Sequence, residues 1–231
     1  MPMNVALVIF ELVVMVLAIS LHDCAQAWMA NRLGDPTARM MGRQTINPVP
    51  HFDFFGMALW PLIYIWRSPL VLGWGKPIPM TTRNFRRPKD EVTAVMAGPV
   101  AQLIAALLCL LLLIVLKHAN PAAGASLGIA AALSLRNLDV PTVALPAIFP
   151  LLLFLYLGIL LNLLLFVFNL VPLPFLDGGK VLVYYLPYNA ARAYERYGLW
   201  LMFGFMFFGF GLVLSVFIPL LTYFNAMLYA L

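Results

Sequence analysis

Apolar residues gather in four long runs along the chain, and shorter stretches between the runs hold most of the charged residues. The runs cover residues 4–30, 92–116, 147–170 and 198–218. Each is long enough to cross a bilayer as an α-helix, which requires about 20 apolar residues. A fifth apolar run, residues 54–65, is too short to cross and predicts a re-entrant or interfacial segment. The pattern therefore predicts an all-α polytopic membrane protein with about four transmembrane helices.

The composition supports the same class. Of the 231 residues, 64% are hydrophobic and 10% are charged, whereas soluble domains carry about 25% charged residues. We find no internal repeat and no low-complexity segment, so residues 1–231 are interpreted as a single membrane domain. The net charge of +5 does not indicate a nucleic-acid partner, because the basic residues lie in loops beside the spans, where they contact anionic lipid headgroups.

The basic residues also predict the orientation of the spans. If residues 54–65 do not cross, twelve of the fourteen Lys and Arg residues lie on one side, and only Lys117 and Arg136 lie on the other. Cytoplasmic loops carry an excess of Lys and Arg. We therefore expect the N-terminus outside, most loops in the cytoplasm, and His22 near the cytoplasmic end of the first span.

Two connecting segments have patterns of their own. Residues 117–146 are weakly apolar with a proline near each end, which favours a short helix lying on the membrane surface. Residues 72–85 read LGWGKPIPMTTRNF, and their prolines, glycines and β-branched residues are typical of extended structure. We expect an interfacial β-hairpin there.

Polar residues interrupt the first apolar run near its end, in the stretch LHDCAQAW at residues 21–28. Ionisable residues inside a membrane span are expensive and mark functional candidates. On a helix, His22 and Gln26 share one face and Asp23 lies beside them. This spacing is that of the His-Glu-x-x-His motif, in which two histidines bind zinc and the glutamate activates water.

A second candidate segment lies far along the chain, in FNLVPLPFLDGGKVL at residues 168–182. Pro172 and Pro174 impose an extended backbone after Asn169, and Gly178 favours a turn beside Asp177. The predicted topology brings Asp177 to the same end of the bundle as His22. Asp177 would there supply a further ligand to a metal site with one open position.

The chain resembles the site-2 protease family of intramembrane zinc metalloproteases, in its compact prokaryotic form. The resemblance covers most of the length and rests on residues 21–56, on GWGKPIPMTTRNFRRPKDEVTAVMAGPVAQ (residues 73–102) and on residues 168–182. It implies a helical core with a buried metal site near the cytoplasmic face of a prokaryotic inner membrane. It also implies cleavage of membrane-embedded helices, presented to the site by strand addition to an interfacial hairpin, here Gly75, Lys76, Pro77, Ile78 and Pro79.

The chain departs from the family pattern at three polar positions. Where the family has His-Glu-x-x-His, this chain has His22, Asp23 and Gln26, although the aspartate ligand remains as Asp177. An amide is a poor zinc ligand beside imidazole or carboxylate, and Asp23 is one methylene shorter than the family's general base. Gln102 stands where the family has asparagine, and it joins Asn169 as a polar residue expected near the centre.

His51 is a further histidine within the matched segments, and it has two interpretations. With His22, Asp23 and Asp177 it could form a rearranged metal site. The interpretation that we favour is that His51 and Asp53 cap their loop and anchor it at the lipid headgroups.

Three functions follow from these features. We favour a catalytically inactive relative that serves as a scaffold, as an accessory subunit or as a binder of membrane helices, with lipids and other membrane proteins as partners. In that case we expect no cofactor, because Asp23 and Gln26 can satisfy His22 by hydrogen bonds. The alternatives are a zinc metalloprotease with an unusual ligand set and an ion or proton pathway through His22, Asp23, Gln26 and Asp177.

Overall fold

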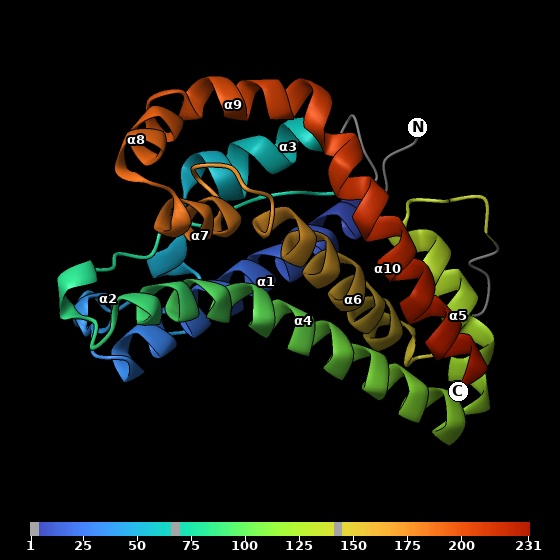
Figure 1. Cartoon of the computed structure of the whole chain (residues 1–231). Helices are drawn as coiled ribbons and strands as arrows, with labels where there is room; N and C mark the ends of the chain where they lie inside the picture. The colour runs from blue at the N-terminus through green and yellow to red at the C-terminus, as the bar shows by residue number, and fades with distance from the viewer. Residues whose placement is uncertain (1–4, 66–69, 141–144) are drawn as a thin grey trace.

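The computed structural model describes residues 5–65, 70–140 and 145–231, which form a bundle of helices (Figure 1). Among these residues four helices are long and apolar enough to cross a membrane, namely α1 (Val5–Arg32), α4 (Pro88–Ala119), α6 (Phe149–Asn169) and α10 (Phe210–Ala230). The prediction of an all-α protein with about four spans is confirmed. Three of these helices match the predicted runs to within a few residues, and the fourth does not.

Helix α6 is the centre of the bundle and packs against α1, α4, α5 (Pro121–Ser134) and α10 (Figure 1). Its sequence is apolar around the whole circumference, as is typical of a helix enclosed on every side. Leu152, Leu157 and Leu163 are fully buried. The outer helices instead expose one apolar stripe each, for example Ile9 and Val13 on α1, which a membrane would cover. The core therefore lies along α6.

The fourth spanning helix begins about twelve residues later than the sequence predicted. The chain from Gly198 forms α9 (Gly198–Gly204), then a π-helical stretch η4 (Phe205–Gly209), and only then α10. Figure 1 shows α9 lying across the top of the bundle above α3, whereas α10 descends beside α5 to the C-terminus. The apolar run continues to residue 231, so its length did not reveal which part follows the bundle axis.

The short apolar run forms two pieces, the π-helical η2 (Phe54–Leu59) and α3 (Trp60–Tyr64). Asp53 caps the first piece, because its Oδ1 accepts a hydrogen bond of 2.6 Å from the backbone N–H of Gly56. Both pieces together are too short to cross a bilayer, as the sequence predicted.

The expected β-hairpin is wrong, because residues 70–85 contain no β-strand. Residues 70–80, among them Gly75, Lys76, Pro77, Ile78 and Pro79, run once across the bundle as a single extended segment. The N–H of Trp74 donates to the Gly56 carbonyl and that of Lys76 to the His51 carbonyl. The prolines carry no N–H, so a regular ladder cannot continue. Asp35, fully buried, holds the end of the segment by accepting bonds from Thr81 and Asn84.

The expected surface helix within residues 117–146 is also corrected. Helix α5 occupies part of this segment, but it packs against α4 and α6 with Ala123, Leu127 and Ala130 fully buried. Its small side chains allow this close packing between helices. Residues 141–144 of that expectation lie outside the described residues.

Short helices complete the described parts of the chain. They are α2 (Thr37–Met40), η1 (Val49–His51), η3 (Thr82–Asn84), α7 (Asp177–Tyr185) and α8 (Tyr188–Arg196). Helices α2 and η1 precede the short apolar run, and α7 follows α6 after a turn through Pro172 and Pro174. These connections bring η1 and α7 to the same end of α1, where the polar residues lie.

Candidate functional site

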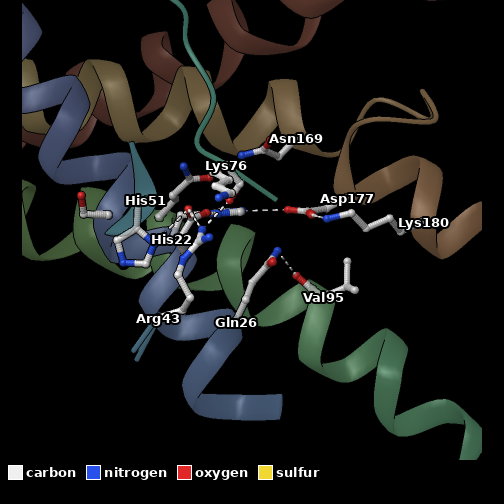
Figure 2. A network of polar contacts seen from close by, with 12 residues as sticks. His22, Gln26, Arg43, His51, Lys76, Val95, Asn169, Asp177 and Lys180 are labelled. Atoms are coloured by element: carbon white, nitrogen blue, oxygen red, sulfur yellow. Dashed lines mark hydrogen bonds and ion pairs between the residues drawn. The ribbon is translucent and has the colours of Figure 1, made fainter. Parts of the chain in front are cut away.

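The polar residues at the end of α1 meet the start of α7, as Figure 2 shows. Nε2 of His22 lies 2.7 Å from Oδ2 of Asp177, although 155 residues separate the two in the chain. The other ring nitrogen, Nδ1, lies 3.1 Å from Oδ1 of Asp23. All three residues are less than 10% exposed. The imidazole of His22 is therefore held between two buried carboxylates.

Local sequence explains why these groups converge. The helical repeat of α1 puts His22 and Gln26 on one face, one turn apart. Asp177 opens α7, where the helix dipole favours a negative charge. The following Gly178 packs against the Leu170 carbonyl, and Gly179 packs against the Leu173 carbonyl, so closely that a Cβ atom would collide at either position. These two glycines let the turn close tightly enough to aim Asp177 at α1.

Asp177 is ionised in this setting. Burial by itself raises the pKa of its carboxyl group, but the neighbouring His22, Lys180 and Gln26 lower the pKa by more, so that the pKa falls below its ordinary value. Lys180, one turn along α7, places its Nζ 3.0 Å from Oδ1 of Asp177. The carboxylate is therefore paired on both oxygens by groups of this chain.

Gln26 stands at the position of the motif's second histidine and acts as a hydrogen-bond donor. Its Nε2 donates to the backbone carbonyl of Val95 on α4, at 2.9 Å (Figure 2). The amide nitrogen of Gln26 is therefore held by α4, and the amide oxygen that remains is a poor zinc ligand beside imidazole or carboxylate.

The residues present do not fit a catalytic zinc site. Such a site needs three protein ligands and one open position. Of the three ligand positions of the family motif, only His22 and Asp177 carry suitable atoms, because the amide of Gln26 is a poor zinc ligand. Within the described residues, no cluster of three or more His, Cys, Asp or Glu side chains could hold a metal ion.

The second oxygen of Asp23 faces a different pair of groups. Nδ1 of His51 lies 3.2 Å from Oδ2 of Asp23, and Nη2 of Arg43 lies 3.6 Å from it. Nε2 of His51 donates to the Thr45 carbonyl at 2.8 Å, with the tautomer assigned from this contact. His51 is fully buried, so it is not an anchor at the headgroups, although it does tie its own loop together.

Arg43 is a residue of the site that the sequence did not reveal. The sequence pattern predicts a basic residue in an exposed loop, yet Arg43 is 4% exposed and its Nη2 also donates to the Lys76 carbonyl at 2.5 Å. Gly42 before it has a positive φ of 70°, a conformation that glycine adopts without strain. The sequence pair Gly42–Arg43 could have indicated that Arg43 is buried, because a glycine in a turn lets the chain direct the next side chain back into the bundle.

Gly98 of α4 is the other residue that sequence reasoning missed. A Cβ atom built there would lie 2.6 Å from Cδ2 and 2.7 Å from Cε1 of the His22 ring. The glycine therefore provides the space in which the imidazole lies. A glycine inside a spanning helix was the signal, since such a position often marks close packing.

Gln102 and Asn169 lie beside this centre. Nδ2 of Asn169 donates to Oε1 of Gln102 at 3.3 Å, while the buried Nε2 of Gln102 has no hydrogen-bond partner among the described residues. Both side chains line a cavity of about 410 Å³ that His22, Gln26 and Asp177 close at its polar end. The remaining walls are largely apolar and come from the extended segment, from η2–α3, from the end of α6 and from α9–η4. Their side chains include Trp60, Trp74, Leu165, Phe168, Leu199 and Phe205.

Comparison with known proteins finds a matching protein family and a similar bacterial protein. The sequence pattern of peptidase family M50 matches residues 10–212. The protein "Putative zinc metalloprotease YwhC" of Bacillus subtilis (strain 168) is 36% identical over 174 residues, which cover 75% of this chain and 67% of the relative. No solved structure matches. The resemblance drawn from the three motifs is thereby confirmed, and the chain belongs to peptidase family M50, the site-2 protease family.

Proposed function

We propose that this chain is a non-catalytic member of its family, one that retains the membrane fold and the cavity but does not hydrolyse peptide bonds. It would serve as a scaffold, as an accessory subunit or as a binder of membrane helices. The observation that carries the proposal is the pairing of the ligand positions with one another. His22 bonds directly to Asp177, and Gln26, whose amide is a poor zinc ligand, donates through Nε2 to the Val95 carbonyl.

The position of the family's general base supports the same conclusion. Asp23 is shorter than glutamate by one methylene, and misplacement of a catalytic group by about 1 Å can cost ~10²-fold in rate. Its Oδ1 lies 3.1 Å from Nδ1 of His22, whereas its buried Oδ2 lies 3.2 Å from His51 and 3.6 Å from Arg43 without a hydrogen bond among the described residues.

The cavity supports a binding role. Clefts of roughly 300–1,000 Å³ with apolar walls and a few polar groups are typical of binding sites, and the cavity of about 410 Å³ falls in this range. Its walls suit an apolar segment of a membrane protein. The unpartnered Nε2 of Gln102 offers a donor to a backbone carbonyl of such a segment.

A zinc metalloprotease is the second candidate. It is favoured by the name of the Bacillus relative and by the survival of His22 and Asp177 at two of the three ligand positions. For zinc to bind, the His22–Asp177 hydrogen bond would have to break and Gln26 would have to release the Val95 carbonyl. We expect the hydrogen-bonded arrangement to prevail.

Elemental analysis of the purified protein tests the proposal. We expect far less than one zinc per chain in the parent protein. The double variant Asp23→Glu, Gln26→His should raise the zinc content towards one per chain, because it restores the missing ligand beside His22 and Asp177. Adding His22→Ala to that variant should abolish the gain. Stoichiometric zinc in the parent, lost in His22→Ala, would overturn the proposal.

A further inference from the structure

A buried ion pair lies in the bundle away from the site just described. Glu11 of α1 is 2% exposed, and Arg136 follows the end of α5. Nη2 of Arg136 donates to Oε2 of Glu11 at 2.5 Å, and Nε donates to Oε1 at 3.2 Å. Two parallel bonds of this kind define the orientation of a guanidinium closely. Arg136 and Glu11 therefore bind each other in one specific geometry.

The backbone of Arg136 supports a specific role. Its φ is 55°, a left-handed conformation that is unfavourable for residues other than glycine and asparagine. Such strain persists only where surrounding contacts enforce it, and it often marks a functional position. Here the strained conformation aims the side chain at two separate elements.

The second element is the end of the short apolar run. Nη1 of Arg136 donates to the Ile65 carbonyl at 2.7 Å. Ile65 is the C-terminal cap of α3, where backbone carbonyls lack partners within the helix. One arginine thus joins α1, the end of α5 and the end of α3, three parts that lie far apart in the sequence.

The joined segment, η2–α3, forms a wall of the cavity. On its inner side Trp60 lines the cavity, and its ring lies 5.8 Å from that of Trp74 on the extended segment. On its outer side Phe55, Leu62 and Ile63 are more than half exposed, as is typical of a surface that faces lipid. The wall is therefore one helix thick, with the cavity on one side and the membrane on the other.

We propose that the Glu11–Arg136 pair is a latch, which holds the η2–α3 wall closed over the cavity through the Ile65 carbonyl. Release of the latch lets the wall swing outward and opens the cavity sideways to the bilayer. What enters, a membrane-embedded apolar segment, rests on the proposed binding function. The latch itself does not depend on that function, because it concerns only the wall.

Distance measurements between spin labels in lipid vesicles test the latch. One label pair joins the wall to a spanning helix, at Ile63→Cys and Leu212→Cys. A second pair joins two spanning helices, at Leu111→Cys and Leu212→Cys. All three labelled positions are exposed, and both label pairs are made in a background with Cys24→Ala and Cys109→Ala. No zinc and no client are added, so the result is independent of the proposed function.

The latch is removed by the double variant Glu11→Leu, Arg136→Asn. Removing both partners leaves no uncompensated buried charge, so the fold is retained, and asparagine accepts the positive φ. We expect a second, longer-distance population for the wall pair and an unchanged distribution for the pair of spanning helices. The matched control is Tyr156→Phe, which removes the buried Tyr156–Asn225 hydrogen bond and should leave both distributions unchanged.

Two results would overturn the latch. One is an unchanged wall distribution in the double variant. The other is an equal broadening of both label pairs, which would show that the ion pair only supports the bundle as a whole.

Discussion

The substitution Asp177→Asn, combined with chelation, distinguishes two interpretations of the site, a metal-free hydrogen-bonded pair and a zinc site. Asparagine has nearly the same size as aspartate but carries no charge. It leaves His22, previously 2.7 Å from a carboxylate oxygen, facing a neutral amide in a position that is 3% exposed. Breaking one side of a buried pair costs about 3–5 kcal/mol. The bond to Lys180 adds little, because that side chain is partly exposed and screened by solvent.

We therefore expect a loss of about 3 kcal/mol in the free energy of unfolding, near the lower end of that range. For a chain of this size each kcal/mol lowers Tm by roughly 2–4 °C, which gives a fall of roughly 6–12 °C. A zinc ion bound at a concentration ~1,000 times its Kd would contribute about 4 kcal/mol of its own. Chelation would remove that contribution from the parent protein. The paired arrangement instead predicts that chelation leaves the Tm of the parent unchanged.

The assay is thermal unfolding in detergent, with and without EDTA, for the parent, Asp177→Asn and a control. Asp139→Asn is the matched control, since Asp139 is exposed and the same chemical change there should alter stability by less than about 0.5 kcal/mol. If EDTA lowers the Tm of the parent as far as Asp177→Asn does, a metal holds the site together and our interpretation of the pair is wrong.

Two further predictions concern packing and topology. Gly98→Ala should cost about 1–3 kcal/mol, because the new methyl group would overlap the His22 ring, whereas Gly128→Ala, where no atom lies within 4 Å, should be neutral or stabilising by thermal unfolding. Cysteines at the exposed positions Ile46 and Lys89 should both react with an impermeant maleimide from the cytoplasmic face of sealed bacterial inner-membrane vesicles. Labelling of the two cysteines from opposite faces would show that residues 54–65 cross the membrane.

The long helices could be predicted because a membrane restricts them to one length and one composition. The meeting of His22 with Asp177 also followed from the sequence, through the helical spacing in α1 and the proline-bounded turn before α7. The last span could not be placed, because residues 198–231 are apolar almost throughout and only packing decides which part enters the bundle.

The features that the sequence did not predict share a physical cause, because each depends on contacts between segments far apart in the chain. Prolines and glycines in residues 72–85 predict an extended backbone, but they do not say whether a second strand lies beside it. Arg43 and Arg136 were interpreted as loop charges, since a sequence does not show that a guanidinium turns inward to a carboxylate. Arg136 meets Glu11 across 125 residues, a contact that only the packed bundle creates.

The π-helical stretch η4 changes the direction in which the side chains of α10 point, relative to those of α9. Leu199, Met202 and Phe205 line the cavity at three-residue intervals, but the next lining residue, Phe210, follows five residues later, which is the repeat of a π-turn. In an α-helix each residue rotates the side-chain direction by about 100°, so the wider turn resets the angular register at this point. That reset lets α9 face the cavity while α10 directs Val213, Phe217 and Phe224 into the core. The π-turn thus changes the direction of the side chains between α9, which lines the cavity, and α10, which packs into the core of the bundle.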